Sequence, residues 1–256
     1  AHHLVARPLD NAPPLMTFTT VVLGGFRGLI ADLLWLRLSY LQDAGNYVEM
    51  VQLSDWIAKL EPSCAEIWNF HAWNMAYNIS VMMVNPEDRW RWVRSGIHLL
   101  RDEGIVFNPD DPELYRELAW LFLHKIGSTT DESHQYYKDR GAGEMRGIFG
   151  DPPAGLDEIL KHPEKARRLR EEYRMDPDIM KDVVAQHGAV NWLRPEAHAL
   201  YWACLGKKHA GSRPAVECDR MIEQSRRFMS EATPAAGTGK DTQPPDKESD
   251  KGATQP

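Results

Sequence analysis

Tryptophan side chains are the groups in this sequence best suited to a binding function. Nine Trp outnumber seven Phe among the 256 residues, and Trp concentrates at packed helix joints and at binding surfaces. Trp68 and Trp73 lie five residues apart in a segment with helical periodicity. Because five residues at 100° each leave the two rings about 140° apart, they lie on different faces of one helix. One ring can therefore pack inside the protein while the other meets a ligand.

The sequence gives little sign of metal, cofactor or catalytic chemistry. Its ten histidines form no HExxH motif, and its three cysteines have no CxxC spacing. We therefore expect no metal ligands, no cofactor and no catalytic residues. Free thiols are the favoured reading of the cysteines, and a bridge between Cys204 and Cys218 stays open. An enzyme is the least favoured class of function.

The charge balance bears on which partners the protein binds. The formal net charge is −7 and the pI is about 5.8, whereas binders of nucleic acid or anionic membranes usually carry a basic patch. The stretch "EDRWRWVRSG", residues 87–96, interleaves Arg with Trp and could stack on bases. An amphipathic helix with Arg outside and Trp inside is the favoured explanation. We expect no nucleic-acid partner.

Helical signals fill the chain between residues 28 and 230. Apolar residues recur at steps of three and four, and no alternating strand pattern appears. The sequence predicts an all-α fold of helices of about 15 residues with short connections. Predicted helix starts are a capping box of Ser63 with Glu66, and the pairs Asn85-Pro86 and Asp111-Pro112; predicted stops are Gly45, Gly104 and Gly127.

An internal repeat relates two of these helices. Placing residues 60–80 over residues 107–127 requires a shift of 47. The matched pairs are Pro62 with Pro109, Glu66 with Glu113, Trp68 with Tyr115, Ala72 with Ala119, Trp73 with Trp120, and Ile79 with Ile126. A large aromatic residue followed four residues later by alanine is typical of a helix that packs closely against its neighbour.

On these residues the chain resembles tetratricopeptide-repeat proteins. Residues 31–62 have that family's two-helix layout and closing proline, a second unit begins at Ala65, and a third begins at Pro112. The second unit departs from the pattern, because a longer hairpin stretches it to 47 residues. The resemblance implies an α-α superhelix of antiparallel helix pairs and a scaffold or adaptor function without enzymatic activity.

The resemblance also implies where a partner binds. It assigns Trp68 and Tyr115 to packing, and the face about 140° further round the first helices lines a concave groove in such superhelices. The residues expected on or near this face are Trp35, Asn69, Trp73, Arg116 and Trp120. Together they would suit a partner protein or an extended peptide, bound by aromatic contact and hydrogen bonds.

Two alternatives stay open for these side chains. Trp73 and Trp120 would be core residues if they pack against an adjacent hairpin or against the segment 141–191. A second class of function, a helical domain that binds a small molecule or glycan, would enclose Trp35, Trp73 and Trp120 in one aromatic pocket.

The predicted organisation has three parts. Residues 1–16 form an N-terminal extension, residues 17–230 form the helical-repeat domain with an irregular insertion at about 141–191, and residues 231–256 form a disordered tail without any large apolar residue. Segments such as "RPEAHALYWA" are similar to bacterial proteins with such repeats. That similarity implies the cell envelope, periplasmic or membrane-proximal through an upstream leader, with a cytoplasmic location as the alternative.

Overall fold

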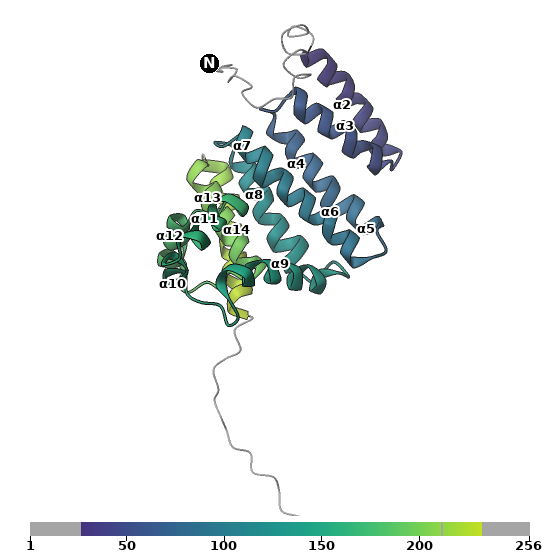
Figure 1. Cartoon of the computed structure of the whole chain (residues 1–256). Helices are drawn as coiled ribbons and strands as arrows, with labels where there is room; N and C mark the ends of the chain where they lie inside the picture. Colours follow the sequence, from purple (N-terminus) through teal and green to yellow (C-terminus); the bar gives the residue numbers. More distant parts are fainter. Residues whose placement is uncertain (1–26, 211, 232–256) are drawn as a thin grey trace, which may run out of the picture.

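The protein folds into helices throughout the part that can be described. The structure, a computed structural model, describes residues 27–210 and 212–231 (Figure 1). The prediction of an all-α fold is confirmed for these residues. The predicted N-terminal extension 1–16 and all but the first residue of the predicted tail lie outside them.

Several helices follow one another without a break and contain π-helical segments, labelled η. The first elements are α2 (Arg27–Asp43), α3 (Tyr47–Leu60), α4 (Ala65–Trp73), η1 (Asn74–Ile79), α5 (Ser80–Met82), α6 (Pro86–His98), η2 (Leu99–Gly104) and α7 (Ile105–Phe107). The later elements are α8 (Pro112–Trp120), η3 (Leu121–Gly127), α9 (His134–Phe149), α10 (Leu156–Leu160), α11 (Pro163–Glu172), α12 (Pro177–His187), α13 (Pro195–His209) and α14 (Ser212–Glu231).

Two predicted helix starts are confirmed and one is wrong. The side chains of Asn85 and Asp111 each accept a hydrogen bond from a backbone N–H two residues later, at 3.1 and 2.9 Å, with proline at the first helical position. The predicted capping box of Ser63 with Glu66 does not form. Cys64 occupies the N-cap of α4, because its N–H closes a turn onto the Glu61 carbonyl oxygen.

Two of the three predicted helix stops are confirmed and one is wrong. Gly45 has a left-handed φ of 69° after α2, and Gly127 ends η3. Gly104 instead lies inside the continuous helix 86–107. A Cβ atom at this position would come within 3.1 Å of the Cβ atom of Trp68. The glycine is therefore explained by close packing of two helices, not by a helix end.

The predicted repeat has a physical counterpart in matched hydrogen bonds. The indole N–H of Trp68 donates to the Pro62 carbonyl oxygen at 2.9 Å, and the hydroxyl of Tyr115 donates to the Pro109 carbonyl oxygen at 2.7 Å. Each aromatic side chain thus fastens the start of its helix to the proline six residues earlier. The two alanines four positions after these rings, 72 and 119, are fully buried.

The partner helices also match at their glycines. A Cβ atom on Gly206 in α13 would lie 2.9 Å from the Cβ atom of Tyr115, just as Gly104 in η2 approaches Trp68. The start of α13 lies beside the end of η3, since a Cβ atom on Gly127 would be 3.7 Å from Pro195. Helix α13 therefore runs antiparallel to α8 and η3, and completes the pair that these elements begin.

Residues 128–194 are consequently inserted between the two halves of this pair. They include α9, which packs on η3 and α6, and the short helices α10 to α12. The predicted irregular insertion began at Gly141, but this glycine lies within α9. Figure 1 shows α2 and α3 at one end of the molecule, and α10 to α14 gathered at the other.

One hydrophobic core connects these helices. It extends from Leu38 and Leu41 on α2 to Met221 on α14. The three cysteines are free thiols, so the bridge between Cys204 and Cys218 that the sequence left open is not formed. None of the helices described is long and apolar enough to cross a membrane.

Candidate functional site

Trp73 and Trp120 each stack on the residue four positions later in the same helix. Trp73 is 39% exposed, and its ring centroid lies 5.6 Å from that of Tyr77. Trp120 is half-buried and stacks almost parallel on His124, with centroids 4.5 Å apart. Residues four apart share one face of a helix, which explains both contacts.

A hydrogen bond joins these two stacked pairs into one surface. The Tyr77 hydroxyl lies 3.1 Å from Nδ1 of His124, and the two ring centroids are 5.9 Å apart. The four rings come from two different helices, which touch along η1 and η3. We refer to Trp73, Tyr77, His124 and Trp120 as the aromatic stack.

Tyr77 and His124 are both in their neutral forms at neutral pH. Burial, and then the nearby Glu117 carboxylate, raise the pKa of Tyr77, so its hydroxyl keeps its proton. Burial, and then the Lys125 ammonium, lower the pKa of His124, which favours the neutral imidazole. In the tautomer of the neutral ring that carries its proton on Nε2, the Tyr77 hydroxyl donates to Nδ1 of His124, and the Nε2–H group is left to donate to a ligand.

A buried ion pair supports the aromatic stack from beneath. The Lys125 ammonium lies 2.6 Å from a carboxylate oxygen of Asp131, and both side chains are almost fully buried. Arg89 of α6 lies 3.7 Å from the same carboxylate. Lys125 also lies 5.1 Å from the centroid of the Tyr77 ring. Removal of one partner of such a pair would leave an uncompensated buried charge and destabilise the protein.

Two of the three described π-helical segments begin immediately after Trp73 and Trp120. Segments η1 and η3 start at residues 74 and 121, which the shift of 47 relates to each other. Segments of this kind are rare and occur frequently at functional sites. They place Tyr77 and His124 on the face where the two helices meet.

The other three predicted site residues make contacts outside the aromatic stack, although Asn69 and Arg116 lie one helical turn before Trp73 and Trp120. Trp35 meets Phe70 edge to face, with centroids 6.0 Å apart. Asn69 is half-buried, and its side-chain oxygen has no hydrogen-bond partner. Arg116 contacts the carboxylates of three glutamates, at 2.7, 3.3 and 3.8 Å. Its guanidinium is thus already engaged and would have to leave these acids to bind a ligand carboxylate.

Tyr77 and His124 were not among the residues predicted from the sequence. A usable signal existed, because the shift of 47 pairs Tyr77 with His124 and so matches one aromatic ring with another. In the sequence, His124 is one of ten histidines without metal-ligand spacing. The hydrogen bond between two helices cannot be seen in the sequence.

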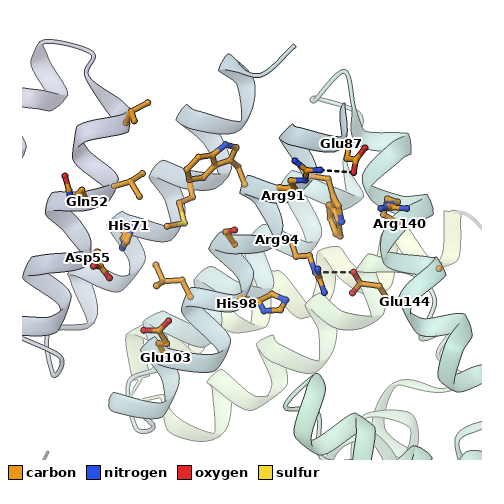
Figure 2. Close-up of a pocket in the computed structure, with 18 of the residues that line it drawn as sticks. Gln52, Asp55, His71, Glu87, Arg91, Arg94, His98, Glu103, Arg140 and Glu144 are labelled. Carbon is orange, nitrogen blue, oxygen red and sulfur yellow. Dashed lines mark hydrogen bonds and ion pairs between the residues drawn. The ribbon is translucent and has the colours of Figure 1, made fainter. Parts of the chain in front are cut away.

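A separate groove of about 1350 Å³ lies between α3, α6 and α9, with residues of α4 and η1 contributing to its lining. Figure 2 shows Arg94 of α6 directed toward Glu144 of α9, at 3.3 Å, and Arg91 directed toward Glu87. None of the five predicted site residues lines this groove. The groove is formed mainly by α3 and α6, which are the second helices of the first two pairs. The predicted site instead uses the first helices, α2, α4 and α8.

Metal coordination finds no support in the described residues, where no three His, Cys, Asp or Glu side chains are placed to hold an ion. The chain matches no family model, no curated protein and no solved structure. The geometry of the aromatic stack and of the groove is therefore the basis for assigning a function.

Proposed function

We propose that this protein is a non-enzymatic adaptor of the tetratricopeptide-like solenoid class that binds a partner protein across the aromatic stack. The observation that carries the proposal is the bond between Tyr77 and His124, because it joins tryptophans of two successive helix pairs into one partly exposed surface.

The solenoid arrangement is supported by contacts that recur from pair to pair. The bonds of Trp68 and Tyr115 to their prolines match, and so do the approaches of Gly104 and Gly206 to those rings. Matched contacts at a constant offset are expected when similar units stack on their neighbours. Helices α4 and α8 also pack side by side.

The chemistry of the stack suits an extended peptide. Indole rings give a large contact area at low cost in conformational entropy, and they are enriched where binding energy concentrates. The Nε2–H of His124 can donate to a peptide carbonyl oxygen between them. The glycan or small-molecule alternative requires Trp35 in the same pocket, and this ring packs on Phe70 instead.

The experiment compares Trp73→Ala, Trp120→Ala and the double variant as baits in native cell extract. Each truncation should reduce capture of the partner by roughly tenfold or more, in line with loss of a central aromatic contact. Trp56→Ala is the matched control, because Trp56 is an exposed tryptophan on α3. Melting curves establish that each variant is folded.

A partner that binds through the stack should be lost from the double variant and kept by the Trp56→Ala control. Undiminished capture by a folded double variant would contradict the proposed function. A larger effect of the two changes on thermal stability than on capture would make these rings part of the core.

A further inference from the structure

The groove between α3, α6 and α9 is a second site with its own chemistry. Its volume of about 1350 Å³ exceeds the roughly 300–1,000 Å³ usual for small-molecule sites. Its walls carry both apolar and charged side chains, with Val48 and Val51 on α3 facing the arginines of α6. A cleft of this size and mixed character fits a segment of polypeptide better than a small ligand.

His71 lies in this groove with its hydrogen-bonding capacity unused. The side chain is only 2% exposed, and neither ring nitrogen has a hydrogen-bond partner. Burial lowers the pKa of His71 to about 4, so at neutral pH the ring carries one donor and one acceptor. Buried polar atoms almost always have partners. A polar group entering from the groove would supply the missing one.

The uncompensated charge near His71 is negative. Asp55 and Glu103 line the same end of the groove, as Figure 2 shows. Within the described residues Glu103 forms no ion pair, and Asp55 shares a single lysine, Lys59, at 2.6 Å. Asp55 acts electrostatically on both His71 and Glu103. Two carboxylates thus face one lysine.

The opposite end of the groove offers no comparable net charge. Arg91 pairs with Glu87 and Asp88 at 3.1 and 2.9 Å, and Arg94 pairs with Glu144 at 3.3 Å. Because these arginines already have acidic partners, an incoming cation gains most at the end that holds Asp55 and Glu103.

We infer that this groove binds a cationic peptide segment. A lysine or arginine side chain of the segment lies between Asp55 and Glu103, and an adjacent polar group forms a hydrogen bond with His71. The site is independent of the aromatic stack, since the two share no residue.

The test uses two synthetic pools of fluorescein-labelled nonapeptides. Both pools are randomised among Ala, Leu, Ser and Gln, except that the central residue is Lys in one pool and norleucine in the other. The full chain should retain the Lys pool roughly tenfold more strongly than the norleucine pool. Absence of this preference overturns the inference.

Two variants locate the binding. Asp55→Asn with Glu103→Gln should abolish the preference for Lys, whereas Asp110→Asn with Asp178→Asn, which removes the same charge from exposed positions, should leave it intact. His71→Phe, which keeps a buried ring, should weaken both pools. Equal preference in the two double variants, or unchanged affinity for His71→Phe, overturns the inference.

Two further measurements separate this site from other possibilities. The variant with Trp73→Ala and Trp120→Ala should bind the Lys pool normally, so failure of the proposed adaptor function does not remove this site. Free butylamine should compete only at concentrations far above those of the peptides. Equal potency of the small amine would show that the site does not recognise a peptide and would overturn the inference.

Discussion

Two buried histidines make the stability of the folded protein depend on pH. His71 is unpartnered, and Nε2 of His198 bonds the Trp192 carbonyl oxygen at 2.9 Å. Burial lowers the pKa of each to about 4 from an ordinary value near 6.5. As pH falls below about 6.5, these two histidines become protonated in the unfolded chain. In the folded protein they become protonated only near pH 4. Both residues therefore remove stability on acidification in this window.

We expect His71→Gln to flatten the loss of stability between pH 7 and pH 4.5. The wild-type histidine should account for roughly 1–3 kcal/mol of that loss, because a pKa difference of one unit corresponds to about 1.4 kcal/mol. Urea unfolding at several pH values measures the effect. Identical pH slopes for the wild type and the variant would mean that His71 titrates normally in the folded protein.

At the residue scale, the sequence identified part of the candidate site. Trp73 and Trp120 were selected because they repeat at a fixed offset and face away from the packing rings. Their joint role depends on Tyr77 and His124, whose hydrogen bond crosses between helices. Arg116 was expected to face a ligand, but Glu113 of the same helix and Glu217 of α14 both pair with it. The pair with Glu113 has helical spacing and is visible in the sequence, whereas Glu217 is brought there by the fold.

At the scale of elements, two helices approach closely at Gly96 of α6. A Cβ atom there would lie 2.8 Å from the backbone oxygen of Ala72. Backbone cannot move aside as a flexible side chain can. The predicted small residue at position 72 thus serves the contact that the repeat pattern implied, and its glycine partner on α6 completes it.

Gly96→Ala should therefore destabilise the protein by about 1–3 kcal/mol through overpacking. Gly143→Ala is the matched control, because Gly143 is also helical and nothing lies within 4 Å of an added Cβ atom. That change should raise stability by up to about 1 kcal/mol through helix propensity. Chemical unfolding of both variants provides the comparison. Equal effects would contradict the close approach of α4 and α6.

Local signals predicted helix ends with mixed success for a physical reason. Asn85 and Asp111 cap helices through bonds within two residues, so the sequence contains the whole interaction. Gly104 was predicted to be a helix stop, because the sequence does not distinguish a glycine required by helix packing from one required by a turn. No local sequence pattern predicted the π-helical segments.

At the scale of the whole molecule, the helical class and the first two helix pairs were predictable from periodicity and the repeat. The third pair was not. Its second helix, α13, follows its first only after residues 128–194, and the close contact of Gly206 with Tyr115 spans this whole insertion. Pairing across such an insertion depends on tertiary packing that no repeat length encodes.

This pairing predicts unequal effects of removing the two ends. A chain that stops at Arg194 lacks α13 and α14 and exposes Tyr115 and its neighbours on α8. It should lose its cooperative unfolding transition. A chain that begins at Tyr47 loses α2 alone among the described helices, and α2 packs chiefly on α3. This chain should keep a single transition at a lower temperature.

Differential scanning calorimetry of both shortened chains checks this prediction. A sharp transition in the chain that stops at Arg194 would show that α8 is stable without α13, and would contradict the pairing of these two helices.

The π-helical segments make the aromatic stack sensitive to the deletion of a single residue during evolution. A turn closed by bonds between residues five apart holds more residues than an α-helical turn. Deleting a single residue in such a turn can restore ordinary helix without breaking it, while rotating everything on one side of the deletion. In η1 or η3 that rotation would swing a tryptophan away from its neighbour. The length of each helix, and not only its composition, therefore determines where the rings point.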